Sequence, residues 1–99
     1  MNLSVAGFDW DSGNRAKCQK HGVTVAEIEE LFTGSPYVAP DPKHSHREDR
    51  LIAVGRNSVG RAMFVAFTLR TTERGRLIRP VTARYMHARE IAAYEEARP

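Results

Sequence analysis

The sequence has one cysteine, no long apolar run and few acidic residues in its second half. Cys18 has no partner for an internal disulfide, and no segment approaches the roughly 18 consecutive apolar residues that a membrane-spanning helix requires. Residues 1–7 lack the basic stretch before a long apolar segment that is typical of a secretory signal. We therefore expect a cytoplasmic protein with no membrane span. A length of 99 residues predicts a single domain, residues 1–99.

Acidic residues are scarce where basic residues are abundant. Residues 1–49 hold five Lys or Arg and eight Asp or Glu, whereas residues 50–99 hold ten and four, so the halves have net charges of −3 and +6. Nine arginines and a single acid, Glu73, lie between positions 50 and 89. Arginine favours bidentate contacts with phosphate or carboxylate. This arginine-rich segment indicates nucleic-acid binding; a solvated face or a docking surface for an acidic partner is the alternative.

An apolar run at residues 62–69 lies between Arg61 and Arg70. Its eight uncharged residues are rich in aromatic and β-branched types, which favours a strand covered on both faces over a helix. We expect this to be the central strand of a sheet. The two arginines then lie where the strand leaves the core, a suitable place to bind an anion.

Local signals place the other elements. Thr24 and Glu27 form a capping box at the start of a helix, and Gly22 is suited to end the helix before it. The expected elements are a strand at 5–10, a helix at about 13–21 capped by Asp11 or Ser12, a helix from Thr24 ended by Gly34, strands at 37–39, 51–54, 61–70 and 77–84, and a helix at about 88–97. Pro80 lacks a backbone N–H, which predicts a bulge or an unpaired side in the last strand.

The order of these elements predicts an α+β fold. We expect a small domain with an antiparallel meander sheet of four to five strands, two N-terminal helices and one C-terminal helix. The helices are expected on one side of the sheet. The opposite face or the rim, where the arginines concentrate, is then available for binding.

A series of short motifs runs through residues 8–95. They are Phe8-Asp9-Trp10-Asp11, Lys20-His21-Gly22-Val23-Thr24, Asp41-Pro42 with His44, Glu48 and Arg50, Gly55, Gly60-Arg61, Phe67-Thr68-Leu69-Arg70, Ile78-Arg79, Ala83-Arg84, and Glu90 with Tyr94. In this order they resemble the BrnT-type toxins of BrnT/BrnA type II toxin-antitoxin modules, which are grouped with RelE-like ribonucleases. Pro80, Thr82 and Tyr85-Met86-His87 depart from the family's pattern near the end of the last strand.

The resemblance implies a RelE-like fold and a cytoplasmic endoribonuclease that inhibits growth by cleaving RNA. It also implies neutralisation by a cognate BrnA-type antitoxin, with operator DNA bound only through the complex of the two proteins. A homodimer or a heterotetramer with the antitoxin is compatible with it.

RNA cleavage without a metal needs a base for the 2′-hydroxyl, an acid for the leaving 5′-oxygen and cations near the phosphoryl oxygens. The candidate catalytic residues are Arg84, Glu90, His21, His44 and Tyr94, and the candidate RNA-binding residues are Lys20, Arg50, Arg61, Arg70 and Arg79. Arg84 is the first choice for a phosphate clamp, the alternative being an ion pair with Glu90. Glu90 is a base or orients an arginine, and Tyr94 stacks on a nucleobase or anchors its helix.

Two histidines in a His-x-His arrangement, His44 and His46, have Asp41 and Glu48 nearby. Two imidazoles make at most half of a zinc site, and Cys18 is remote in sequence. We therefore expect no metal and no cofactor. A metal-dependent hydrolase is the weakest alternative, and a non-enzymatic binding module that uses the arginine-rich face is the stronger one.

Overall fold

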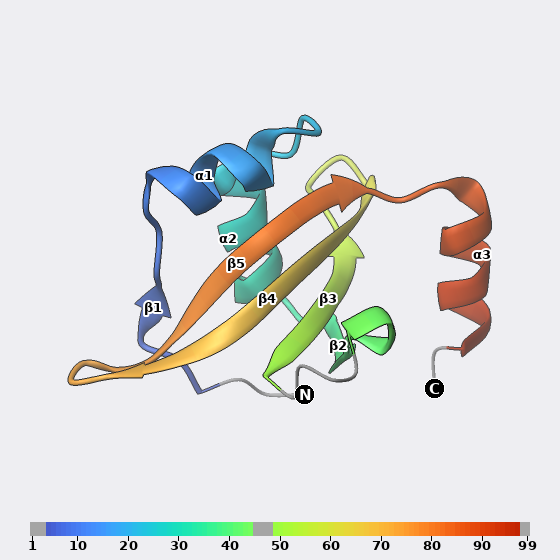
Figure 1. Ribbon diagram of the computed structural model, residues 1–99. Coiled ribbons are helices and arrows are strands. Elements are labelled where there is room, and N and C mark those ends of the chain that lie inside the picture. The colour runs from blue at the N-terminus through green and yellow to red at the C-terminus, as the bar shows by residue number, and fades with distance from the viewer. Residues whose placement is uncertain (1–3, 45–48, 98–99) are drawn as a thin grey trace.

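The computed structural model describes residues 4–44 and 49–97, and within these ranges the chain forms a five-stranded sheet and three α-helices (Figure 1). The elements are β1 (Gly7–Phe8), α1 (Ser12–Gln19), α2 (Val25–Thr33), β2 (Tyr37–Pro40), the short 3-10 helix η1 (Pro42–His44), β3 (Arg50–Arg56), β4 (Ala62–Thr72), β5 (Gly75–Tyr85) and α3 (Ala88–Ala97). The predicted α+β class is confirmed. No helix among the described residues is both long and apolar enough to cross a membrane.

The sheet has the strand order β1-β5-β4-β3-β2, so β4 is the middle strand, as its apolar sequence predicts. Strands β2 to β5 pair antiparallel in succession, whereas β1 pairs with β5 in parallel. The sheet is therefore mixed rather than wholly an antiparallel meander. β1 contributes only the pairs Gly7 with Leu77 and Phe8 with Ile78, and so short a strand carries no signal of its direction in its own sequence.

One face of the sheet carries the core. Met63, Val65 and Phe67 alternate along β4 and are fully buried beneath α1 and α2. Phe32 of α2 packs edge-on against Phe67, with ring centroids 4.9 Å apart, and Ile28 of the same helix has no exposed surface. This face therefore fixes how α2 lies on the sheet.

Both N-terminal helices begin with the capping residues that the sequence predicts. Asp11 caps α1 in a reciprocal pair with Asn14, and Thr24 caps α2 in a reciprocal pair with Glu27. Each pair satisfies two backbone N–H groups that the first helical turn leaves without partners. Gly22 ends the turn after α1 with φ of +93°, the left-handed geometry expected of it.

The predicted irregularity at Pro80 is a β-bulge. Ala66 pairs with Thr82 and Phe67 pairs with Pro80, so Val81 is the extra residue of β5. The Pro80 carbonyl accepts a 2.9 Å hydrogen bond from Nδ2 of Asn14, which is buried. The bulge is thus tied to α1.

The C-terminal helix α3 does not share the side of α1 and α2, so the expectation of helices on one side only is wrong. We call the face opposite α1 and α2 the open face. Tyr37, Val54, Phe64 and Arg84 form one cross-strand row on it. Tyr94 of α3 packs edge-on against Tyr37, with centroids 5.6 Å apart, and Glu90 of α3 pairs with Arg84.

The attachment of α3 is light. Its described side chains, at residues 88–96, are exposed or half-buried, and Figure 1 shows the helix standing beyond the end of β5. A helix of ten residues gains little stability by itself. The few side-chain contacts to the open face therefore set its position.

Candidate functional site

A pocket of about 390 Å³ lies at the end of the sheet where β4 begins and β5 ends. Its lining residues are His21, Arg61, Arg84, Tyr85, Met86 and His87. We call it the arginine pocket. It brings together His21, Arg61 and Arg84, three of the predicted site residues that are far apart in the sequence.

Three separate segments meet at the arginine pocket. His21 follows the last turn of α1, and Arg61 precedes β4. The Met86 N–H donates to the Ala62 carbonyl at 3.0 Å, which continues the β4–β5 pairing beyond the end of β5. This bond holds the segment that carries Tyr85 and His87 beside the start of β4.

Arg84 is held by two partners. Its Nη1 and Nη2 donate to the two carboxylate oxygens of Glu90, each at 2.7 Å, and its guanidinium carbon lies 4.6 Å from the centroid of the Phe64 ring. The hydrogen bonds to Glu90 raise the pKa of Arg84. The predicted alternative, an ion pair with Glu90, is therefore present.

Glu90 is a firmly ionised carboxylate. Its hydrogen bonds from Arg84, and next the one from the His87 backbone N–H at 2.9 Å, lower its pKa to about 2. A base with so low a pKa accepts a proton poorly near neutral pH. Of the two predicted roles for Glu90, the geometry favours orientation of an arginine.

The guanidinium of Arg61 lies over the Tyr85 ring, with its central carbon 3.6 Å from the ring centroid. The Tyr85 hydroxyl donates to the Glu27 carboxylate, at 2.9 Å to Oε1 and 3.1 Å to Oε2. Burial, followed by this hydrogen bond, raises the pKa of Tyr85. Tyr85 is therefore neutral near pH 7 and serves as a support for Arg61.

Asn57 connects the β3–β4 loop to α2. Its Nδ2 donates to Oε2 of Glu27 at 2.8 Å, and its Oδ1 accepts the backbone N–H groups of Val59 and Arg61, at 3.1 and 2.8 Å. Burial raises the pKa of Glu27, but hydrogen bonds from Asn57, Thr24 and Tyr85 outweigh it, so the pKa is lowered overall. The position of Arg61 thus depends on a connected polar network.

The other predicted RNA-binding arginines lie outside the arginine pocket and are paired with acids. Arg50 contacts Asp41 at 3.1 Å, Arg70 contacts Asp9 at 2.8 Å, and Arg79 contacts Asp11 at 2.8 Å and Asp9 at 3.4 Å. The hydrogen bond to Asp11 raises the pKa of Arg79. Lys20 is exposed next to His21 but does not line the pocket.

The remaining predicted residues are not in the arginine pocket either. Tyr94 lines a separate groove of about 220 Å³ between α3 and the sheet, together with Val54, Ala62 and others. His44 ends η1, and its side chain lies outside the described part of the structure, as do His46 and Glu48.

Sequence reasoning did not select Tyr85, His87 or Asn57 as site residues. Tyr85 and His87 belong to the segment that departs from the family's pattern. His87 had a second signal in its residue type, because histidine is the usual acid or base near neutral pH. The contacts of Asn57 and Tyr85 with Glu27 join residues 30 and 58 positions apart, so no local pattern announces them.

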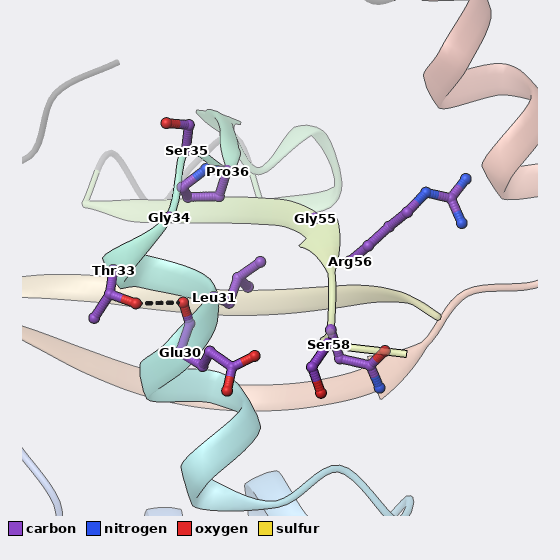
Figure 2. A pocket seen from close by; sticks show the side chains of 10 residues that line it. Glu30, Leu31, Thr33, Gly34, Ser35, Pro36, Gly55, Arg56 and Ser58 are labelled. Atoms are coloured by element: carbon purple, nitrogen blue, oxygen red, sulfur yellow. Dashed lines mark hydrogen bonds between the residues drawn. The ribbon is translucent and has the colours of Figure 1, made fainter. Parts of the chain in front are cut away.

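A second pocket, of about 430 Å³, lies between the end of α2 and the β3–β4 loop. Figure 2 shows Glu30 on one wall and Arg56 directed away from it, and no histidine is among the residues that line it. Larger size does not make this pocket the better candidate, because it lacks a side chain suited to proton transfer near neutral pH.

No cluster of three or more His, Cys, Asp or Glu residues suited to a metal occurs in residues 4–44 and 49–97. Cys18 is fully buried, and burial raises its pKa to about 11. Its thiol is therefore a packing group rather than a nucleophile.

These features define a small α+β domain with a cationic, histidine-containing pocket suited to an anionic ligand. A family model described as "Ribonuclease toxin, BrnT, of type II toxin-antitoxin system" matches residues 10–90. The chain belongs to this BrnT family of ribonuclease toxins. No curated protein sequence matches it.

Proposed function

We propose that the chain is a metal-independent endoribonuclease that cuts RNA at the arginine pocket by attack of a 2′-hydroxyl on the adjacent phosphate. The observation that carries this proposal is the meeting of two arginines and two histidines, Arg61, Arg84, His21 and His87, in one pocket. The family supplies the class of reaction.

Arg84 binds the scissile phosphate. A guanidinium has five N–H donors, and in Arg84 two of them bond to Glu90. A phosphate therefore either binds the remaining donors beside Glu90 or displaces the Glu90 carboxylate. Stabilisation of the charge that develops on the phosphoryl oxygens is the main catalytic contribution of such a cation.

His21 and His87 carry out the proton transfers. Both residues are exposed, line the arginine pocket and come from different segments of the chain. Histidine suits this role because its unperturbed pKa lies near neutral pH. One imidazole takes the proton of the 2′-hydroxyl and the other protonates the leaving 5′-oxygen.

Glu90 and Tyr94 act indirectly in this proposal. Glu90 orients Arg84, and Tyr94 holds α3 through Tyr37. Lys20, Arg50, Arg70 and Arg79 contribute longer-range attraction for the RNA backbone.

The type II toxin-antitoxin family implies an antitoxin partner. We propose a BrnA-type antitoxin that neutralises the chain in the cytoplasm and supplies the contact with operator DNA. The assembly is a homodimer of this chain or a heterotetramer with that partner.

The direct test is incubation of the purified chain with a short unstructured RNA and identification of the product ends. Attack by the 2′-hydroxyl gives 2′,3′-cyclic phosphate or 3′-phosphate products, and His21→Ala should slow their formation by about 10²–10⁴. Salt-dependent RNA binding without any product would contradict the proposal and favour a non-enzymatic binding module.

A further inference from the structure

Arg61 differs from the paired arginines described above. A carboxylate contacts each of five arginines, namely Arg50, Arg56, Arg70, Arg79 and Arg84. In the part of the chain that the structure describes, the Arg61 side chain instead contacts the Tyr85 ring. Arg61 is exposed, and among residues 4–44 and 49–97 no carboxylate forms an ion pair with it. One face of the guanidinium is therefore covered by the ring, and Arg61 remains open to solvent at the pocket.

The Arg61–Tyr85 stack is fixed from both sides. The Asn57 side chain binds the Arg61 backbone N–H at 2.8 Å, and Glu27 holds the Tyr85 hydroxyl at 2.9 Å. Since Asn57 also donates to Glu27, the two supports are joined. A planar group held in place before a ligand arrives loses little entropy on binding.

Nucleobases stack on arginine planes and aromatic rings in proteins that bind single-stranded RNA. Arg61 and Tyr85 line the same pocket as Arg84, and its volume of about 390 Å³ is in the range typical of small-ligand sites. The pocket thus offers a flat cationic surface beside a phosphate-binding guanidinium.

We propose that the Arg61–Tyr85 stack is a nucleobase platform that holds the base of a nucleotide next to the phosphate bound by Arg84. This proposal rests on the proposed function, in that it takes single-stranded RNA as the ligand of the arginine pocket. Asn57 and Glu27 are positioning residues that act through the stack.

The test uses the full chain and short single-stranded RNA in which every 2′-hydroxyl is methylated, so that no cleavage by the 2′-hydroxyl can occur. Affinity is compared between an oligonucleotide with all bases and a set in which one position at a time is abasic. At the position that occupies the platform, the wild type should bind the complete oligonucleotide about 5- to 100-fold more tightly.

Arg61→Lys is the matched variant, because lysine keeps the charge but lacks the planar group. It should keep the salt dependence of binding and lose most of the discrimination against the abasic site. Asn57→Ala should reduce the discrimination as well, with thermal unfolding followed to confirm that it folds. Arg76→Ala removes an exposed arginine at the opposite end of β5, and it should keep the discrimination of the wild type.

Equal affinity of the wild type for complete and abasic oligonucleotides would overturn the platform, and so would unchanged discrimination in Arg61→Lys. Failure of the proposed function is a separate result. A chain that discriminates against the abasic site but does not cut unmodified RNA retains the platform and loses the ribonuclease assignment.

Discussion

Arg84 and Glu90 form a two-bond ion pair that joins the end of β5 to the first turn of α3, with both N–O distances at 2.7 Å. Arg84 lines the arginine pocket, whereas Glu90 does not. The carboxylate therefore presents to Arg84 the same bidentate geometry that a phosphate would. The roles of Arg84 and Glu90 in catalysis can therefore be tested separately with single substitutions.

Removal of the Arg84 guanidinium should abolish most of the activity. Arg84→Ala is expected to lower the cleavage rate about 10²–10³-fold, since it removes a preorganised donor from the transition state. Arg84→Lys keeps a charge but cannot form two parallel hydrogen bonds, so its cleavage rate should lie between those of the wild type and Arg84→Ala. The measurement is single-turnover cleavage, with growth arrest on induced expression as a second readout. A wild-type rate in Arg84→Ala would contradict the assignment.

Neutralisation of Glu90 should lower the rate through the position of Arg84, by much less than removal of Arg84 itself, and should leave the shape of the pH–rate profile unchanged. A carboxylate with a pKa of about 2 does not titrate in the range where the enzyme works. A general base would instead cost about 10²–10⁴ when removed, and the acidic limb of the profile would change. Glu95→Gln is the control for Glu90→Gln, because Glu95 lies on the same helix as Glu90 and forms an exposed ion pair with Arg56 of β3.

The same pair should contribute to stability in a pH-dependent way. The pKa of Glu90 is about 2 in the folded chain against a usual 4.5, so its contribution is complete above pH 4.5 and is lost as the pH falls toward 2. Because both side chains are about one-third exposed, at 34% and 32%, the contribution should be only about 1 kcal/mol. Urea unfolding of the wild type and Glu90→Gln at several pH values measures it. A stability difference that does not shrink below pH 4.5 would exclude this linkage.

An excess of chelator should leave the cleavage rate unchanged when the substrate is a short unstructured RNA. The proposed reaction uses histidines for proton transfer and arginines for charge stabilisation. A structured RNA would confuse the result, because its own folding depends on divalent ions. Loss of activity that is restored by a divalent cation would show that the metal-free mechanism is wrong.

The sequence predicted the elements whose signals are local. Thr24 and Glu27 lie three positions apart, and this capping pattern predicted the start of α2. The composition of residues 62–69 predicted that β4 is the central strand. The side of the sheet on which α3 lies was predicted wrongly, because the spacing of Ile91 and Tyr94 shows that one face of the helix is apolar but not which surface covers that face.

The prediction of the site was limited by long-range pairing. Sequence reasoning selected His21 and Arg84 as separate candidates, and both line the arginine pocket. Charge counts also suggested that Arg70 and Arg79 contact RNA, but both meet acids of the first half of the chain, Asp9 and Asp11. Acids of the first half form ion pairs with some arginines of the second half, which partly cancels the opposite net charges of the two halves. A count of charges along the sequence cannot show which arginines lack such an ion pair.

Asn14 should be the polar side chain whose chemistry matters most to the packing of α1. It is 7% exposed, and its Nδ2 donates at 2.9 Å to the carbonyl oxygens of both Asp9 and Pro80. Asn14→Ala leaves these two acceptors without a donor and is expected to cost about 2–3 kcal/mol. Asn14→Asp places a carboxylate against them, so it should cost more at neutral pH and recover part of the difference in acid.

Urea unfolding at pH 7 and pH 4 measures both variants, and unchanged m-values show that the unfolded states are comparable. Lys17→Ala, an exposed change on the same helix, is the control and should stay within about 0.5 kcal/mol of the wild type. Equal costs for Asn14→Ala and Asn14→Asp at both pH values would mean that Asn14 acts through its volume alone. In that case the bulge at Pro80 would not depend on the amide that donates to it.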